Sequence, residues 1–316
     1  MALSIQSNMA SMSIQNQLGR SNNDLSTALE RLGSGFKINS AKDDAAGLQI
    51  ASRLNAQVRG QEAALYNSNN AMSMMQTAEG AFDEMTNIAY RMKELATQAA
   101  NGTNGADEGI ALGSEYLALG DELASIMQNT SFGGTLLLAD TTTTTVTAAT
   151  GANGVPGVRV NTAIAADGKF ADAAGVTFQV GSSTAETLGV NVSAALNTLH
   201  GLIGTADGSQ AGLGDISTQA KATAAATSGM VKTDELIEAI GTARSALGAS
   251  MNRLDHTMNN VTNMKENTQA AASTLMDADF AAETSNMTKQ QLLMNSGISV
   301  LSTANSTTQM IGSLLR

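Results

Sequence analysis

Apolar residues recur along the start of the chain at the spacing of an α-helix. Between residues 3 and 32 they lie mostly three, four or seven positions apart. This stripe is close to the heptad spacing of helices that pack against other helices. Gly33-Ser34-Gly35 interrupts the stripe, so the first helix is expected to end there. Its apolar members are Ile5, Met9, Met12, Leu18, Leu25, Leu29 and Leu32.

A longer helical stripe runs from about residue 44 to residue 100, with no proline to stop it. Ser40-Ala-Lys-Asp43 places an acid three residues after a serine, a capping sequence that precedes helices. At 1.5 Å per residue, this helix would be about 80 Å long, too long for a compact globule. Asn101–Gly105 is expected to end it, and a third helix is expected at about 107–129.

The pattern then changes to one of strands and turns. Val158–Val160, Val176–Val180 and Leu188–Val192 alternate with period two among many Gly and Thr residues. Alternation of this kind is typical of strands, and residues 130–200 are expected to form hairpins and loops.

Helical spacing returns at about residue 216 and continues to about 315, with a short break near Asp277-Ala-Asp279. Apolar residues in the last helix include Leu292, Leu293, Ile298, Leu301, Ile311 and Leu314. Residues 273–316 carry only five charged side chains, so a lone helix there would be poorly solvated. Because both terminal stripes need partners, we expect the two ends to pair with each other.

These patterns predict a mainly α fold with a smaller β region: long antiparallel helices from both chain ends form a coiled coil or bundle, with β-hairpins in the middle. The predicted segments are an inner terminal-helix domain at 1–42 and 273–316, a helical bundle domain at 43–139 and 216–272, and a β-rich variable surface region at 140–215. A long intracellular coiled coil would account for the stripes but not for the central strands.

Composition narrows the classes of protein. Only 14% of residues are charged, against about 25% in typical domains. Long helices with so few charges must be buried in each other or in neighbouring molecules. The net charge of −11 argues against a nucleic-acid partner. No segment is apolar enough to suggest membrane insertion, and the first ten residues do not have the pattern of a secretory signal peptide.

Candidate chemistry is sparse. His200 and His256 are isolated, without the His-Glu-x-x-His spacing that a zinc peptidase needs. Asp43-Asp44 is better explained by helix capping than by a carboxylate pair. No catalytic, metal or cofactor site is therefore expected. The Met-rich stripes fit a core better than a peptide groove, whereas glycosylation of Ser and Thr residues in 141–192 stays open beside a plain solvated loop.

Six stretches of the sequence carry recognisable motifs, colinear at both ends of the chain: Leu32–Leu48, Gln76–Gly80, Met92–Gln98, Gly248–Leu254, Asp277–Glu283 and Ser313–Arg316. Together they resemble the bacterial flagellins. Gly33 and Thr308 depart from the family pattern, which usually has serine and often proline there, and the insert at about 140–175 follows no family pattern.

The resemblance implies a secreted, extracellular structural subunit that self-assembles into the flagellar filament for swimming motility. The implied partners are further copies of the chain, the flagellar cap and hook-junction proteins, the flagellar export chaperone and the type III export apparatus. A hook–filament junction protein of the same family is the alternative, and filament formation by the purified chain separates the two. An enzyme displayed on a filament is a third hypothesis, which the missing catalytic constellations disfavour.

The resemblance also implies two sets of site residues. Arg91, Leu95 and Glu115 match the contact patch for the flagellin-sensing Toll-like receptor of animals. The subunit–subunit assembly residues would be apolar members of the terminal stripes: Ile5, Met9, Leu25, Leu29, Leu32, Leu293, Ile298, Leu301, Ile311 and Leu314.

Overall fold

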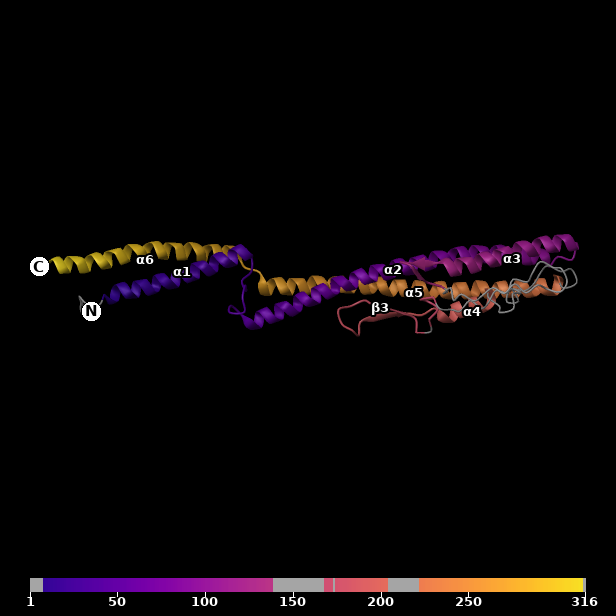
Figure 1. Ribbon diagram of the computed structural model, residues 1–316, viewed down its shortest axis with the longest axis horizontal. Helices are drawn as coiled ribbons and strands as arrows, with labels where there is room; N and C mark the ends of the chain where they lie inside the picture. The colour runs from indigo at the N-terminus through magenta and orange to yellow at the C-terminus, as the bar shows by residue number, and fades with distance from the viewer. Residues whose placement is uncertain (1–7, 139–167, 173, 204–221, 315–316) are drawn as a thin grey trace. The chain divides into compact units, whose positions relative to one another are not determined.

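The computed structural model describes residues 8–138, 168–172, 174–203 and 222–314. Six α-helices dominate this part of the chain (Figure 1), and two small antiparallel hairpins complete it. The predicted fold class is therefore confirmed. The helices are α1 (Met9–Ser34), α2 (Ala45–Ala99), α3 (Ala106–Asn129), α4 (Ser193–Ile203), α5 (Ala222–Met276) and α6 (Phe280–Leu314).

The chain divides into two compact units. Unit 1 comprises residues 1–59 and 264–316, and unit 2 comprises residues 60–263. Unit 1 therefore combines a segment from each end of the chain, whereas unit 2 is one continuous stretch. The five segments expected from the sequence, with their boundaries, stay predictions.

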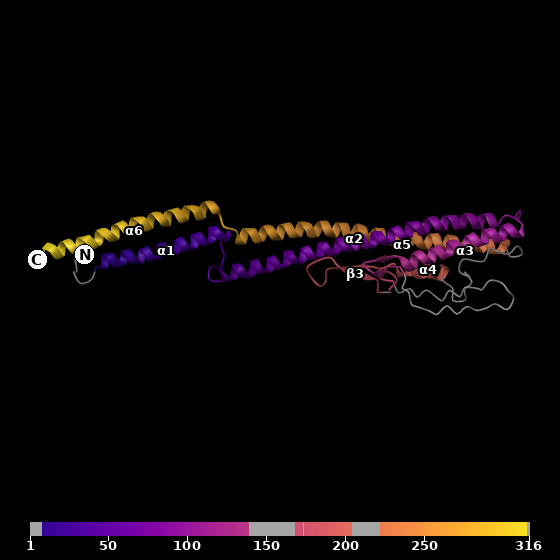
Figure 2. The ribbon, with the colours of Figure 1, turned by 45° about the horizontal axis from the view of Figure 1, so that its top comes forward.

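In unit 2, α2 and α5 run antiparallel, since Lys93 of α2 pairs with Asp234 while Asp83 pairs with Arg244. Both views show α3 lying along these two helices (Figures 1 and 2). Twelve buried positions of α2 alternate in steps of three and four, the heptad spacing of coiled coils, and Met74 and Leu95 are buried beside them. The twelve are Gln61, Ala64, Ser68, Ala71, Met75, Ala78, Phe82, Met85, Ala89, Met92, Ala96 and Ala99.

The central segment packs short elements on this core. Strands β1 (Ser131–Phe132) and β2 (Thr135–Leu136) form one hairpin, and β3 (Val176–Gln179) and β4 (Thr187–Val190) form the other. Helix α4 covers residues for which the sequence pattern predicts hairpins and loops, so that prediction is wrong there. The expected strand at 158–160 lies outside the described residues.

Side-chain caps set the helix ends. Gly35 ends α1 with a φ of 78°, a left-handed conformation that glycine adopts without strain. At the start of α2 the cap is Asp44, whose Oδ1 accepts from the backbone N–H of Gly47 at 2.8 Å. The Ser40–Asp43 pair expected as the cap instead forms the preceding turn, because Asp43 accepts from the backbone and hydroxyl of Ser40. These bonds lower the pKa of Asp43.

Two linkers of unit 1 are joined by a short backbone bridge between Phe36 and Asp277. The N–H of Lys37 donates to the carbonyl of Met276 at 2.7 Å, and the N–H of Ala278 donates to the carbonyl of Gly35 at 2.9 Å. The break expected near Asp277-Ala-Asp279 is thus confirmed, and it is tied to the end of α1.

Candidate assembly surface

Helices α1 and α6 of unit 1 lie side by side and antiparallel (Figure 2). Near the start of α1, the hydroxyl of Ser11 donates to Oδ1 of Asn305 at 3.1 Å. Near its end, Nη1 of Arg31 lies 3.2 Å from Oε1 of Glu283. Polar contacts at both ends of the pair therefore fix which residues of the two helices face each other.

The side chains between these two helices are small. The buried residues of α1 are Ser11, Ser21 and Ala28. Gly297 of α6 faces Leu18 so closely that an added Cβ would lie 2.9 Å from Cδ2 of Leu18. This close approach lets the backbones come together, but it buries little apolar area. Two helices joined in this way cannot also cover their larger apolar side chains.

Those larger side chains remain on the surface of unit 1. Among the predicted assembly residues, Met9, Leu29, Leu293 and Ile298 are exposed, while Leu25, Leu32 and Leu301 are half-buried. Ile5 and the side chains of Ile311 and Leu314 lie outside the described residues. Other large exposed apolar residues of this unit are Met12, Phe36, Ile50, Met264, Phe280, Leu292, Val300 and Met310.

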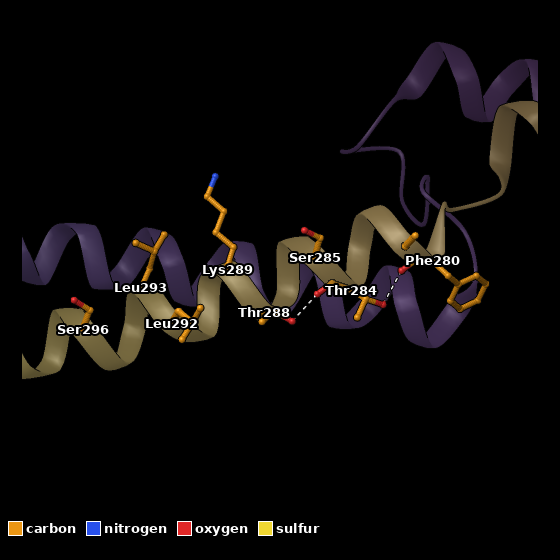
Figure 3. Close-up of a pocket in the computed structure, with 9 residues that line it drawn as sticks. Phe280, Thr284, Ser285, Thr288, Lys289, Leu292, Leu293 and Ser296 are labelled. Carbon is orange, nitrogen blue, oxygen red and sulfur yellow. Dashed lines mark hydrogen bonds between the residues drawn. The ribbon is translucent and has the colours of Figure 1, made fainter.

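Part of this exposed surface is an open groove along α6, with a volume of about 1040 Å³ (Figure 3). Its lining residues follow two parallel rows of spacing four, so the groove runs between two ridges of the helix. A ridge of another helix packs into a groove of this kind. One charged side chain, Lys289, lies among the lining residues, which are Phe280, Ala281, Thr284, Ser285, Thr288, Lys289, Leu292, Leu293 and Ser296.

Charge is divided unequally between the units. Residues 1–59 and 264–316 contain nine Lys or Arg and eight Asp or Glu, so unit 1 is nearly neutral. Residues 60–263 consequently contain eight Lys or Arg and 20 Asp or Glu, a net charge of −12. Copies of unit 1 can approach one another without the repulsion that copies of unit 2 would meet.

The three residues of the predicted receptor-contact patch, Arg91, Leu95 and Glu115, differ in burial. Arg91 of α2 reaches Glu115 of α3 through Nε and Nη2, at 3.0 and 2.7 Å, and reaches Glu94 through Nη1 at 2.6 Å. These bonds, first that to Glu115, raise the pKa of Arg91. Leu95, expected beside them on the surface, is instead 0% exposed. Its face of α2 is covered within unit 2, so of the three predicted residues only Arg91 and Glu115 have exposed side chains.

No three His, Asp or Glu side chains of the described residues gather to hold a metal ion. His200 is buried in α4, with Nδ1 at 2.7 Å from the carbonyl of Leu196. No helix of the part of the chain that the structure describes is long and apolar enough to cross a membrane.

Long paired helices, exposed apolar ridges and a near-neutral terminal unit define a helical structural protein built to associate with like chains. The family comparisons agree. Residues 5–143 match the bacterial flagellin N-terminal helical region, and residues 230–315 match the flagellin C-terminal helical region. The chain belongs to the bacterial flagellin family, whose members are structural proteins of the flagellar filament and not enzymes.

Individual relatives match along the whole chain. Flagellin D of Vibrio anguillarum is 35% identical over 376 aligned residues, covering 100% of both chains. The crystal structure of Bacillus cereus flagellin covers 66% of this chain and 94% of its own, with 28% identity and a TM-score of 0.44. A structure described as a flagellar hook-associated protein from Vibrio parahaemolyticus covers 74% and 99%, with a TM-score of 0.50. Its 14% identity shows a shared fold only, so it does not favour the hook-junction alternative.

Proposed function

We propose that this chain polymerises into the flagellar filament through the outward apolar faces of α1 and α6, and that the groove on α6 is part of the contact between copies. The observation that carries the proposal is the exposure of Leu292 and Leu293 in that groove, at 65% and 43%. Burying a leucine-sized side chain contributes about 1.5–3 kcal/mol. Such contacts repeat at every subunit of a polymer, so a modest energy for each one is sufficient.

The polymer also explains why unit 1 has so little core of its own. Helices with exposed apolar ridges and few charges gain most of their stability from packing rather than from propensity. Neighbouring copies would supply that packing. The near-neutral charge of unit 1 lets many copies gather at close range, with the acidic unit 2 carrying the solubility of the free chain.

Leu292→Glu tests this proposal. Leu292 is exposed in the single chain, so the charge should not unfold it, but it would be buried without a partner in a polymer. We expect the variant to stay monomeric under conditions in which the unmodified chain forms filaments visible by electron microscopy. Gln291→Glu is the control, because Gln291 is exposed on the same helix but does not line the groove. Normal filaments from Leu292→Glu would refute the assignment.

The partners other than further copies of the chain are proposals drawn from the family resemblance. Export through the type III apparatus with a dedicated chaperone, contact with the cap and hook-junction proteins, and an extracellular location all accompany filament growth. Recognition by the flagellin-sensing Toll-like receptor is proposed at Arg91 and Glu115, with Leu95 supporting them from beneath. A receptor-reporter assay on monomeric Arg91→Ala tests that role, and an unchanged response would remove it.

A further inference from the structure

The turn between α2 and α3 contains two Asn-Gly pairs, Asn101-Gly102 and Asn104-Gly105. In such pairs the backbone nitrogen of glycine can attack the side-chain carbonyl carbon of the preceding asparagine, because glycine has no side chain to obstruct it. The turn belongs to unit 2 and lies outside α1 and α6, so this chemistry is independent of the assembly surface.

The two asparagines are held differently. Oδ1 of Asn101 accepts one long hydrogen bond from the N–H of Thr103, at 3.3 Å, and Asn101 is exposed. Asn104 is half-buried, and its Nδ2 donates to the carbonyl of Gln98 at 2.7 Å. A side-chain amide fixed in this way cannot rotate its carbonyl carbon toward the next nitrogen without losing a good hydrogen bond.

The two glycines differ as well. A Cβ added at Gly102 would meet nothing within 4 Å, whereas one at Gly105 would lie 2.6 Å from Oε2 of Glu108. The space around Gly102 leaves room for a five-membered ring to close there. At Gly105 the backbone already forms the N-terminal cap of α3, and it is crowded by the first turn of that helix.

We propose that Asn101 is a site of spontaneous deamidation in the folded chain, while the neighbouring Asn104 is protected. The N–H of Gly102 loses its proton to water or hydroxide, and the nitrogen bonds to Cγ of Asn101. The bond from Cγ to the amide nitrogen breaks, and ammonia leaves with a proton. One water then opens the succinimide at either carbonyl, leaving aspartate or isoaspartate. The net reaction consumes one water and releases one ammonia, with no oxidant or reductant.

The product changes the charge and the backbone length of the turn. It places a new carboxylate just after the last turn of α2, where the helix dipole presents its negative end. The isoaspartate form also adds a methylene to the backbone in the connection that returns α3 along α2. Both changes weaken the α2–α3 turn. Because deamidation accumulates with time, the fraction of converted Asn101 should mark the age of a subunit.

The test follows deamidation at each asparagine of the full chain by peptide mass spectrometry, with fragmentation that separates aspartate from isoaspartate. In the folded chain at mildly alkaline pH, Asn101 should convert several-fold faster than Asn104. In urea both should convert at similar rates, because both are followed by glycine. Equal rates in the folded chain, or faster conversion of Asn104, would overturn the proposal.

Gly102→Ala provides the matched variant. The added methyl meets nothing within 4 Å and the position does not need a positive φ, so folding should be unchanged. It should nevertheless slow conversion at Asn101 several-fold while leaving the rate at Asn104 as it was. If Asn101 converted at the unmodified rate in Gly102→Ala, attack by the Gly102 nitrogen would be excluded.

Discussion

Arg31 of α1 and Glu283 of α6 form an ion pair at 3.2 Å in which the acid is 8% exposed. A carboxylate removed from water in this way depends on its cation. Arg31→Gln should therefore destabilise the α1–α6 pair by about 1–3 kcal/mol, and the partial exposure of Arg31 favours the lower end. Hydrogen exchange of the α1 amides should become correspondingly faster.

The control for this pair is Asp24→Asn. Asp24 meets Gln290 at 3.5 Å on the same two helices, but this contact is exposed and long. Its loss should leave amide exchange in α1 nearly unchanged. If Arg31→Gln exchanged no faster than Asp24→Asn, the buried pair would not hold the two helices together.

The long helices could be predicted from sequence because the apolar spacing of each helix lies within its own continuous segment. The expected helix at 44–100 is α2 at Ala45–Ala99, and the glycines near 35 and the acids near 277 end helices as expected. The missed α4 is short, and the alternation just before it favoured strands. The depth of Leu95 could not be predicted either. Its spacing from Arg91 gives a shared side of α2, but burial depends on how the other helices of unit 2 cover that side.

Leu95→Ala should behave as a core mutation. The side chain is fully buried in the unit 2 core, so truncation removes its packing and leaves a cavity. Substitutions of this kind cost about 2–5 kcal/mol. Urea denaturation followed by circular dichroism should show this loss, while Arg91→Ala should change stability little because its pairs are exposed. A loss of receptor signalling in Leu95→Ala would therefore not identify a contact residue. Equal stability of the two variants would contradict the burial argument.

His200 should make the folded chain sensitive to mild acid. Burial lowers the pKa of His200 below 6.5, although the bond to the Leu196 carbonyl opposes this. Between that lowered value and 6.5, the unfolded chain binds a proton that the folded chain does not, so stability falls as pH falls through this range. The stability that comes from the neutral, buried imidazole of His200 is fully present above about pH 6.5. The measurement is the Tm difference between the unmodified chain and His200→Leu across pH 5–8.

His256→Gln is the control for that measurement, since His256 is exposed on α5. The Tm difference for His200→Leu should change with pH by more than the difference for His256→Gln does. A flat difference for both variants would mean that His200 is protonated as readily in the folded chain as in the unfolded one.

Gln61 is one of two polar residues in the coiled-coil stripe of α2. It is 1% exposed, and neither Oε1 nor Nε2 has a hydrogen-bond partner in the described part of the chain. Ser68, two steps along the same stripe, is satisfied instead, because its hydroxyl donates to the carbonyl of Ala64 at 2.8 Å. An unsatisfied buried polar group costs about 1–3 kcal/mol. Gln61→Leu, which nearly conserves volume, should therefore raise the free energy of unfolding by about 1–2 kcal/mol.

Ser68→Ala is the matched control at a core position of the same helix. It removes a donor already satisfied within its own helix, so stability should change by less than about 1 kcal/mol.

A core polar residue at heptad spacing can instead fix the register of paired helices at a cost in stability. Under that role, Gln61→Leu would raise the unfolding midpoint but broaden the transition as alternative α2–α5 registers become populated. A lower free energy of unfolding for Gln61→Leu would mean that the amide stabilises the fold, contrary to the unpaired geometry.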